Sequence, residues 1–389
     1  MASNSRINFD YAAGGPMLPE VKHTMGAVFE EYGNPSSLHQ EGQRAKRWLD
    51  RARKEVASLI NAKLEEIHFT SCGTESNNWA LRGLMAANKR KGNHLIISAI
   101  EHPSITLVAK RLEVDGVKVS ILPVDREGLV SPQALKQALT PETVLVSIML
   151  ANGEVGTIEP IKELAALAHE QGCLFHTDAV AAVGHIPVDV KALGVDALSF
   201  AADQFDGPRG AAALFVREGV RILPLLEGGG QEHGGRSGTE ALPAVVGMGV
   251  AAGLARQQLP ERMARLTELR ERLREGLKQR LPTIRFNGSW SLRLPHNVHV
   301  CVDGVSSESL VRGFDHAGLA VGLGAACNSK TMRPSSVLKA MGLTDEQAAG
   351  AVVFTLGAWS SEDEIDQALE IILKVVEQLR NVTKLTVRA

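Results

Sequence analysis

The fold of this chain is indicated by the stretch IHFTSCGTESNN, residues 67–78. Residues 67–70 form a short apolar run, a polar turn follows, and a helical pattern extends from Glu75 to Ala87. A strand followed by a tight turn and a helix is the repeating unit of a parallel sheet covered by helices. In such sheets ligands bind beyond the carboxyl ends of the strands. We therefore expect the turn at 71–74 to face a ligand site.

The same alternation continues from about residue 40 to residue 250. Further strand-like runs occur at 95–100, 117–122, 144–150, 174–177, 197–200 and 212–216. Short apolar strands between helices predict an α/β fold whose sheet is mostly parallel and flanked by helices on both faces.

The composition changes near residues 257–260, and a charged amphipathic helix is predicted to follow. Two strand-like runs, 297–302 and 352–356, and a last helix complete the chain. We predict a large domain at 15–257 and a smaller C-terminal α/β domain made of 1–14 and 258–389.

Composition restricts the class of protein. The 389 residues are 44% hydrophobic and 22% charged, with a net charge of -2, which is ordinary for a soluble globular protein. The dispersed charge gives no indication of a nucleic-acid or membrane partner, and we see no signal sequence or membrane-spanning run. The four cysteines lack the paired spacing of a zinc site or disulfide framework. We expect a cytoplasmic location.

The turn after residue 70 has the features of a phosphate site. Backbone amides at a helix N-terminus attract anions, and Gly73 and the Thr74 hydroxyl would complete the cradle. The alternative is that Thr74 only caps the helix. Its context favours the phosphate interpretation.

Seven segments in order along the chain resemble the cysteine desulfurases of the class V aminotransferase group, and the likeness is strongest to the IscS/NifS branch. These segments are residues 10–13, 34–39, 70–78, 101–102, 228–232, 236–239 and 324–327. The resemblance implies the fold type I architecture of pyridoxal-phosphate-dependent transferases. It also implies a homodimer with composite sites.

The resemblance assigns roles to three residues. His102 would stack on the pyridine ring and assist proton transfer, and Asp178 would pair with the pyridinium nitrogen. Thr239 would reach the phosphate from the partner subunit. Each has a plainer alternative, because a lone histidine is more often structural, an aspartate after a strand can cap a helix, and Ser-Gly-Thr can be a turn.

The resemblance fails where the family carries its Schiff-base lysine. The stretch SFAADQFDGPRG, residues 199–210, places Gln204 at that position. An amide nitrogen is not nucleophilic, so covalent attachment of the cofactor is excluded there. The other departures also fall on polar contacts: Ala181 replaces a glutamine, Gly153 an asparagine, Asp203 a histidine, Val353 the arginine that grips the substrate carboxylate, and Gly14-Gly15 a threonine pair. A partly retained cofactor site is the expected result.

Cys327 lies in a run of small and polar residues that ends at Pro334, which predicts a flexible loop. Lys330 and Arg333 would favour its thiolate. The alternative of a buried, inert cysteine better fits Cys173 and Cys301. In the family this loop thiolate takes up substrate sulfur as a persulfide and delivers it to a scaffold protein.

Three functions follow from these features. In the first, a desulfurase-like protein docks an IscU-like scaffold and uses Cys327 to relay persulfide sulfur or to ligate iron in a nascent [2Fe-2S] cluster. In the second, the chain is an active cysteine desulfurase that converts L-cysteine to L-alanine and enzyme-bound sulfur with non-covalent pyridoxal phosphate, His102 being the base. The third is a structural relic. We favour the first, with desulfurase activity reduced or lost.

Overall fold

A central sheet of seven strands organises the larger part of the molecule in the computed structural model, which describes residues 6–323 and 334–386. Its strands are, in spatial order, β2 (Ile67–Thr70), β8 (Ala212–Val216), β7 (Ala197–Ala201), β6 (Leu174–Asp178), β5 (Thr143–Ser147), β3 (His94–Ser98) and β4 (Lys118–Leu122). β8 is antiparallel to both of its neighbours, and the remaining pairs are parallel. The predicted α/β class and its mostly parallel sheet are therefore confirmed.

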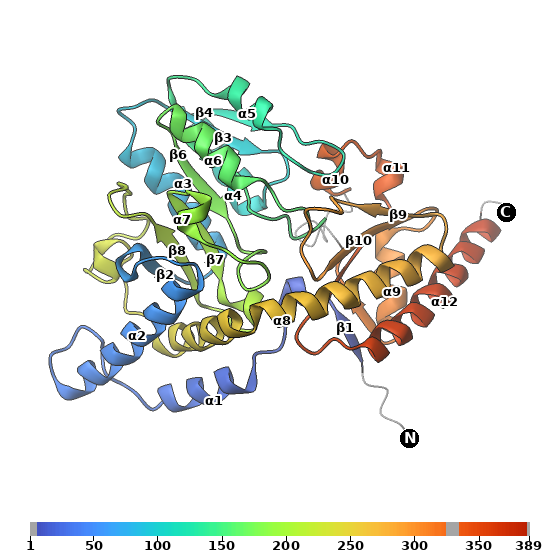
Figure 1. Cartoon of the computed structure of the whole chain (residues 1–389), viewed down its shortest axis with the longest axis horizontal. Helices are drawn as coiled ribbons and strands as arrows, with labels where there is room; N and C mark the ends of the chain where they lie inside the picture. The colour runs from blue at the N-terminus through green and yellow to red at the C-terminus, as the bar shows by residue number, and fades with distance from the viewer. Residues whose placement is uncertain (1–5, 324–333, 387–389) are drawn as a thin grey trace.

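Helices cover both faces of this sheet (Figure 1). The helices of this part are α1 (Pro19–Val28), α2 (Gln40–Leu59), α3 (Gly73–Ala87), α4 (Pro103–Val114), α5 (Pro132–Ala138), α6 (Ile161–Glu170) and α7 (Val190–Leu193). Because side chains alternate along a strand, Ile96 packs into the core with α2 and α6 whereas Leu95 and Ile97 pack into the core with α3 and α4. The strands β3, β5, β7 and β8 are buried throughout, as sequence runs without polar alternation predict, whereas the edge strand β4 is partly exposed.

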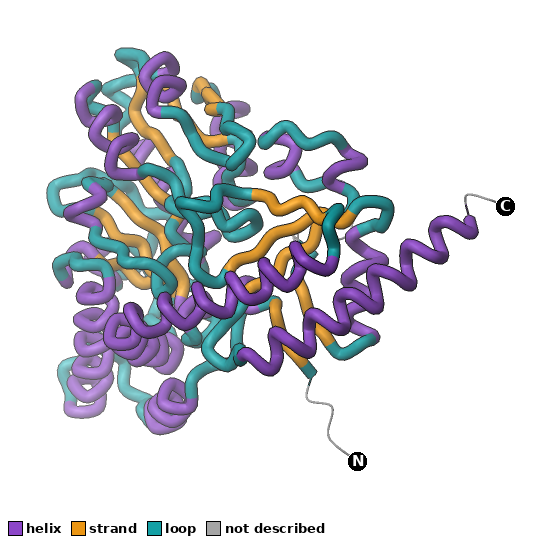
Figure 2. The backbone as a smooth tube through the Cα atoms, turned by 45° about the vertical axis from the view of Figure 1, so that its right-hand side comes forward, coloured by secondary structure: helices purple, strands orange, loops and turns teal. Residues whose placement is uncertain are grey.

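A smaller antiparallel sheet lies beside the large one (Figure 2). In it β10 (Asn297–Val302) pairs with β9 (Ile284–Asn287) and β12 (Ala351–Thr355), and in a separate two-stranded sheet β1 (Ile7–Phe9) pairs in parallel with β11 (Leu319–Val321). Its helices are α9 (Ser307–His316), α10 (Ser336–Ala340), α11 (Asp345–Ala348) and α12 (Glu362–Thr386). Among the residues that the structure describes, the short 3-10 turns are η1 (Tyr11–Ala13), η2 (Leu64–Glu66), η3 (Ala202–Phe205) and η4 (Glu232–Gly234).

One helix, α8 (Leu242–Arg280), contributes to the cores of both parts. Its first half packs against α1 and α2, and its second half packs beside α12 (Figures 1 and 2). The amphipathic stripe at Leu266, Leu269 and Leu273 is buried as predicted. The helix nevertheless begins well before residue 257, and Pro260 lies inside it rather than before it. The division into domains at 15–257 and at 1–14 with 258–389 stays a prediction.

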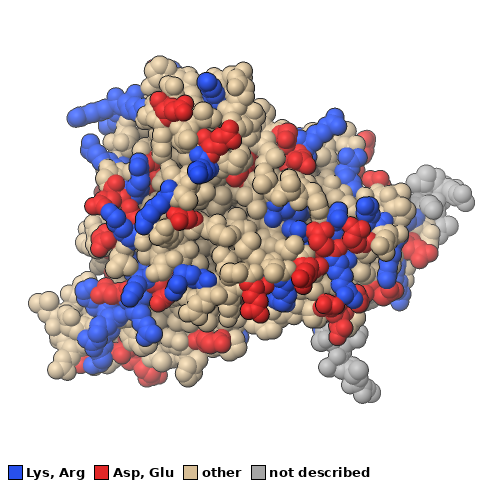
Figure 3. All heavy atoms as spheres, in the orientation of Figure 1, with Lys and Arg blue, Asp and Glu red and all other residues tan. Residues whose placement is uncertain are grey.

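The surface shows no segregation of charge on the face seen in Figure 3, where Lys and Arg lie among Asp and Glu. Among the helices of the described residues, none is both long and apolar enough to span a bilayer.

Candidate functional site

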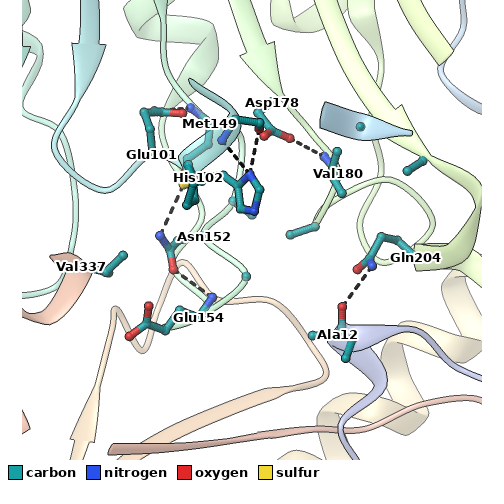
Figure 4. Close-up of a pocket in the computed structure, with 18 of the residues that line it drawn as sticks. Ala12, Glu101, His102, Met149, Asn152, Glu154, Asp178, Val180, Gln204 and Val337 are labelled. Carbon is teal, nitrogen blue, oxygen red and sulfur yellow. Dashed lines mark hydrogen bonds between the residues drawn. The ribbon is translucent and has the colours of Figure 1, made fainter. Parts of the chain in front are cut away.

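The ends of the central strands meet at a cavity of about 440 Å³. His102 follows β3, Asn152 follows β5, Asp178 ends β6, and Gln204 follows β7 (Figure 4). Carboxyl ends of neighbouring parallel strands meet at one edge of a sheet, which is where such folds bind ligands. Gly73 and Thr74, which open α3, line the same cavity. The structure thus brings together Gly73, Thr74, His102, Asp178 and Gln204, the five site positions that the sequence analysis predicted here.

Asp178 is buried at the end of β6. Its Oδ2 accepts a hydrogen bond from Nδ2 of Asn77 at 2.6 Å, and its Oδ1 accepts one from the backbone N–H of Val180 at 2.9 Å. Burial raises the pKa of Asp178, against the opposing effect of these hydrogen bonds and of His102. Because a buried carboxyl is costly to ionise alone, its ionised form is stabilised strongly by a cationic partner, such as a protonated ring nitrogen.

His102 caps α4 and also lines the cavity. Its Nδ1 accepts a hydrogen bond from the backbone N–H of Ser104 at 3.1 Å and lies 2.7 Å from the Ser104 hydroxyl. The structural and site interpretations of this histidine are therefore compatible. The cap fixes the ring, and a fixed ring can serve as a platform for a ligand.

The turn before α3 suits an anion. Cys72, not Thr74, is the N-cap residue, and its side chain makes no capping hydrogen bond. Thr74 lies in the first turn, so the alternative that it merely caps the helix is wrong. A Cβ on Gly73 would lie 2.6 Å from Cγ2 of Val180, which explains why glycine occupies this close approach. First-turn N–H groups have no partners within their own helix and are available to a phosphate.

Gln204 occupies the η3 turn after β7. Its Nε2 donates a hydrogen bond to the backbone carbonyl of Ala12 at 3.1 Å, and its side chain also hydrogen-bonds Asp203. Burial raises the pKa of the Asp203 carboxyl. Among the described residues that line the cavity there is no lysine or arginine. Of the other departures from the family pattern, Ala181, Gly153 and Val353 line the cavity as well, whereas Gly14 and Gly15 do not.

Glu101 was missed as a site residue, although it is the neighbour of His102 in the Glu-His pair. Its Oε1 accepts hydrogen bonds from the Ser98 hydroxyl at 2.6 Å and from the backbone N–H of Met149 at 2.9 Å. Burial raises the pKa of Glu101 to about 8. The sequence gives one signal for Glu101, which is a carboxylate at the end of an apolar strand. Burying a carboxylate there costs free energy, so its presence indicates a functional role.

Asn77 and Glu154 were also given no role. Asn77 bridges Ser104 and Asp178 from α3, and burial raises the pKa of Glu154 to about 8. The position of Asn77 in a helix does not by itself reveal its role in the site, because an asparagine in a helix usually faces solvent.

Two predicted residues are not placed in the cavity. Thr239 is exposed and does not line the cavity of its own chain. Its segment is tied to α3 by the ion pair of Arg236 and Glu75, in which Nε and Oε1 are 2.8 Å apart. Cys327 lies outside the described residues, although Leu323 and Ser335 line the cavity. Within the described ranges no three metal-binding side chains cluster, so a metal role for Cys327 stays a prediction.

These residues fit pyridoxal phosphate in part. Asp178, His102 and the close turn at Gly73 suit its ring and phosphate. The anchor does not fit, since the described lining offers no primary amine for a Schiff base.

Comparisons with known proteins agree with this geometry. The sequence model of the class-V aminotransferase family matches residues 7–368. The chain is 44% identical over 385 residues to cysteine desulfurase IscS of Clostridium botulinum (strain Kyoto / Type A2), covering 98% of this chain and 97% of the relative. It is 43% identical over 384 residues to cysteine desulfurase IscS of Methanosarcina thermophila, covering 98% and 95%.

Solved structures are similar over most of the chain. A NifS-like protein superposes with a TM-score of 0.90 at 34% identity, covering 96% of this chain and 100% of that one. DndA from Streptomyces lividans superposes with a TM-score of 0.75 at 31% identity, covering 87% and 96%. The sheet order, the cavity at the strand ends and these similarities together show that the chain belongs to the class-V aminotransferase family, among its IscS/NifS-type cysteine desulfurases.

Proposed function

We propose that this chain works in sulfur mobilisation and iron–sulfur cluster assembly in the cytoplasm without covalent pyridoxal phosphate chemistry. Cys327 would relay persulfide sulfur, or ligate a nascent [2Fe-2S] cluster, for an IscU-like scaffold. The observation that carries the proposal is Gln204, whose amide donates to Ala12 at the position of the family's lysine.

The loss of the amine removes two contributions at once. An amide cannot attack an aldehyde, and it cannot move a proton near neutral pH. When bound, pyridoxal phosphate would supply an electron sink at its ring. Asp178 would hold the ring nitrogen, and Gly73 and Thr74 would hold the phosphate. Proton transfer would fall to His102, and because its Nδ1 caps α4, it would have to use Nε2.

Sulfur relay needs neither lysine nor arginine. The Cys327 thiolate would attack the outer sulfur of a donor persulfide, forming a new S–S bond as the donor's S–S bond breaks and the donor leaves as a thiolate. The same exchange passes the sulfur onward to a scaffold thiolate. A soft thiolate is also the usual ligand of an iron–sulfur cluster.

A second candidate is an active cysteine desulfurase that holds pyridoxal phosphate without a covalent bond. The hydrogen bonds that join Asp178, Asn77 and Ser104 favour it, because this network supports the ring. Against it stand Val353, which offers no cation to a substrate carboxylate, and Gln204.

A homodimer would complete either site. Thr239 is exposed on a segment held to α3, which suits a residue that serves the partner subunit.

The test follows sulfur rather than cofactor. The wild-type chain is treated with a small-molecule persulfide, and sulfane sulfur is mapped by mass spectrometry. We expect it on Cys327, absent in Cys327→Ser and retained in the matched variant Cys72→Ser, since Cys72 is the exposed cysteine among those described. In parallel, the chain with added pyridoxal phosphate and L-cysteine is assayed for L-alanine.

The two readouts separate the candidates. Sulfane sulfur on Cys327 without turnover to alanine supports the relay. Catalytic alanine formation that Cys327→Ser abolishes would overturn it in favour of the non-covalent enzyme. Sulfur spread over other cysteines would contradict both.

A further inference from the structure

The cavity has an unusual balance of charge. Five of its described lining residues carry carboxyl groups: Asp10, Glu101, Glu154, Asp178 and Asp203. His102 is the one described lining residue that can carry a positive charge. Three departures from the family pattern act in this direction, because Gln204, Asp203 and Val353 each stand where that pattern has a basic residue. Together these three departures remove positive charge from the cavity.

The amide side chains of the lining strengthen this polarity. Asn77 directs its Nδ2 to Ser104 and Asp178, and Asn152 directs its Nδ2 to the carbonyl of Ile100 at 3.0 Å. Gln204 donates from Nε2 to the carbonyl of Ala12. The orientation of Asn77 is fixed, since turning its oxygen toward Asp178 would place two acceptors together. Asn77 thus gives its amide hydrogens to the protein and leaves its oxygen for a ligand, whereas the oxygen of Asn152 already accepts from the backbone N–H groups of Glu154 and Val155.

Three buried oxygen atoms of the lining have no hydrogen-bond partner among the described residues. They are Oδ1 of Asn77, Oε2 of Glu101 and Oε1 of Glu154, and Asn77 and Glu101 are only 1% and 5% exposed. Buried acceptors are seldom left unpaired, and an unpaired one at a cavity indicates a donor supplied by a ligand. Burial raises the pKa of Glu101 to about 8, and a cation beside Oε2 would favour the ionised carboxylate, in which Oε2 is an acceptor.

We propose that the cavity binds a pyridine-type ligand that carries its own protonated amine, and that it discriminates against ligands whose corresponding group is a carboxylate. The inference deepens the proposed function and rests on its ring subsite at Asp178 and His102. The ammonium supplies the positive charge that Gln204 no longer provides, and its three N–H donors match an acceptor-lined wall. A free amino acid is the wrong class of ligand, because Val353 offers its carboxylate no partner.

The test uses three probes that share one ring and differ at one substituent. Pyridoxamine carries an ammonium there, pyridoxine a hydroxyl and 4-pyridoxate a carboxylate. Binding to the full-length wild-type chain is measured by calorimetry at low ionic strength. We expect affinity to fall in the order ammonium, hydroxyl, carboxylate, with about tenfold or more between the first and the last. Equal affinities, the reverse order or no binding of any probe would overturn the proposal.

Two variants locate the effect. Gln204→Lys returns a cation to the cavity, so it should reduce or reverse the preference for pyridoxamine. Gln279→Lys adds the same charge at an exposed position on α8 and should keep the wild-type order. A preference unchanged by Gln204→Lys would also overturn the proposal. These are binding readouts, so the sulfur relay at Cys327 can fail while this inference stands, and the reverse is equally possible.

Discussion

At the scale of single residues, Gln204 defines what this site can do. Its Nε2 is bound to the carbonyl of Ala12, a residue of the N-terminal η1 turn, so the amide is a structural link as well as a lost nucleophile. A lysine at the same position would have no amide oxygen to accept a hydrogen bond, and it would offer a primary amine instead.

Restoring that amine should restore the anchor. We predict that Gln204→Lys binds pyridoxal phosphate with a visible absorbance band that borohydride removes, while the desulfurase reaction with L-cysteine stays at least about tenfold below that of a complete site, since Val353 still offers no carboxylate contact. Absorbance spectra and alanine formation measure the two parts. High activity in this single variant would show that the arginine position is dispensable.

Glu101 should give the protein a pH-dependent stability. The raised pKa means that the protonated carboxyl stabilises the fold fully below its ordinary value of 4.5, and that this contribution is lost as the pH rises to about 8. We predict that the unfolding free energy of the wild type falls by about 2–5 kcal/mol relative to Glu101→Gln between pH 5 and pH 9. Urea denaturation at the two pH values measures it.

The exposed Glu163 on α6 provides the comparison for this measurement. Glu163→Gln should follow the wild type at both pH values. A Glu101→Gln variant that also follows the wild type would show that Glu101 is ionised in the folded chain.

At the scale of elements, α2 and the segment that carries Thr239 are joined by a buried ion pair. Arg53 of α2 donates to both carboxylate oxygens of Glu232 at 2.7 Å and to the carbonyl of Ile67, and Glu232 accepts from the N–H of Phe69 at 2.9 Å. Glu232 has a φ of 48°, a conformation that costs free energy outside glycine. The ion pair therefore holds a strained turn against the end of β2.

Breaking this pair should be costly. We predict that Arg53→Met lowers the unfolding free energy by about 3–5 kcal/mol, because it leaves the Glu232 carboxylate buried without its partner. The double variant Arg53→Met, Glu232→Gln should lose less than the sum of the two single variants. Arg51→Met, one position exposed on the same helix, should change stability by less than about 0.5 kcal/mol. Strict additivity in the double variant would contradict the pairing.

Elements were predictable from the sequence to different degrees, for physical reasons. The run at 212–216 is β8 as predicted, because a fully buried strand leaves an uninterrupted apolar run. The start of α8 was not predicted, because Pro260 suggests a helix boundary. The packing of α8 on both sides of Pro260 nevertheless keeps this proline inside the helix. In the site, the strand-end position of Asp178 was readable. The link from Gln204 to Ala12 was not, because the two lie 192 positions apart and no local pattern connects them.

At the scale of the whole molecule, one surface suggests association. Tyr32 and Leu38, between α1 and α2, are 82% and 92% exposed, and Phe29 beside them is also largely exposed. Large apolar side chains gathered in one segment commonly mark an interface. A second copy of this chain is the partner that the proposed composite site requires.

We predict that Tyr32→Asp with Leu38→Asp converts a dimer to a monomer, halving the mass measured by light scattering. Leu107→Asp with Val114→Asp, on the exposed face of α4, is the matched control and should leave the mass unchanged. A wild-type chain that is monomeric at high concentration would contradict the composite site.

The most direct test of the central claim is to trap any Schiff base in the wild-type chain. The protein is incubated with pyridoxal phosphate, reduced with borohydride and digested, and the modified peptides are identified by mass spectrometry alongside those of Gln204→Lys. We predict a single strong adduct at position 204 in the variant and none in the cavity of the wild type. A stoichiometric adduct on a native lysine, one that protects the cavity from pyridoxamine, would contradict the account.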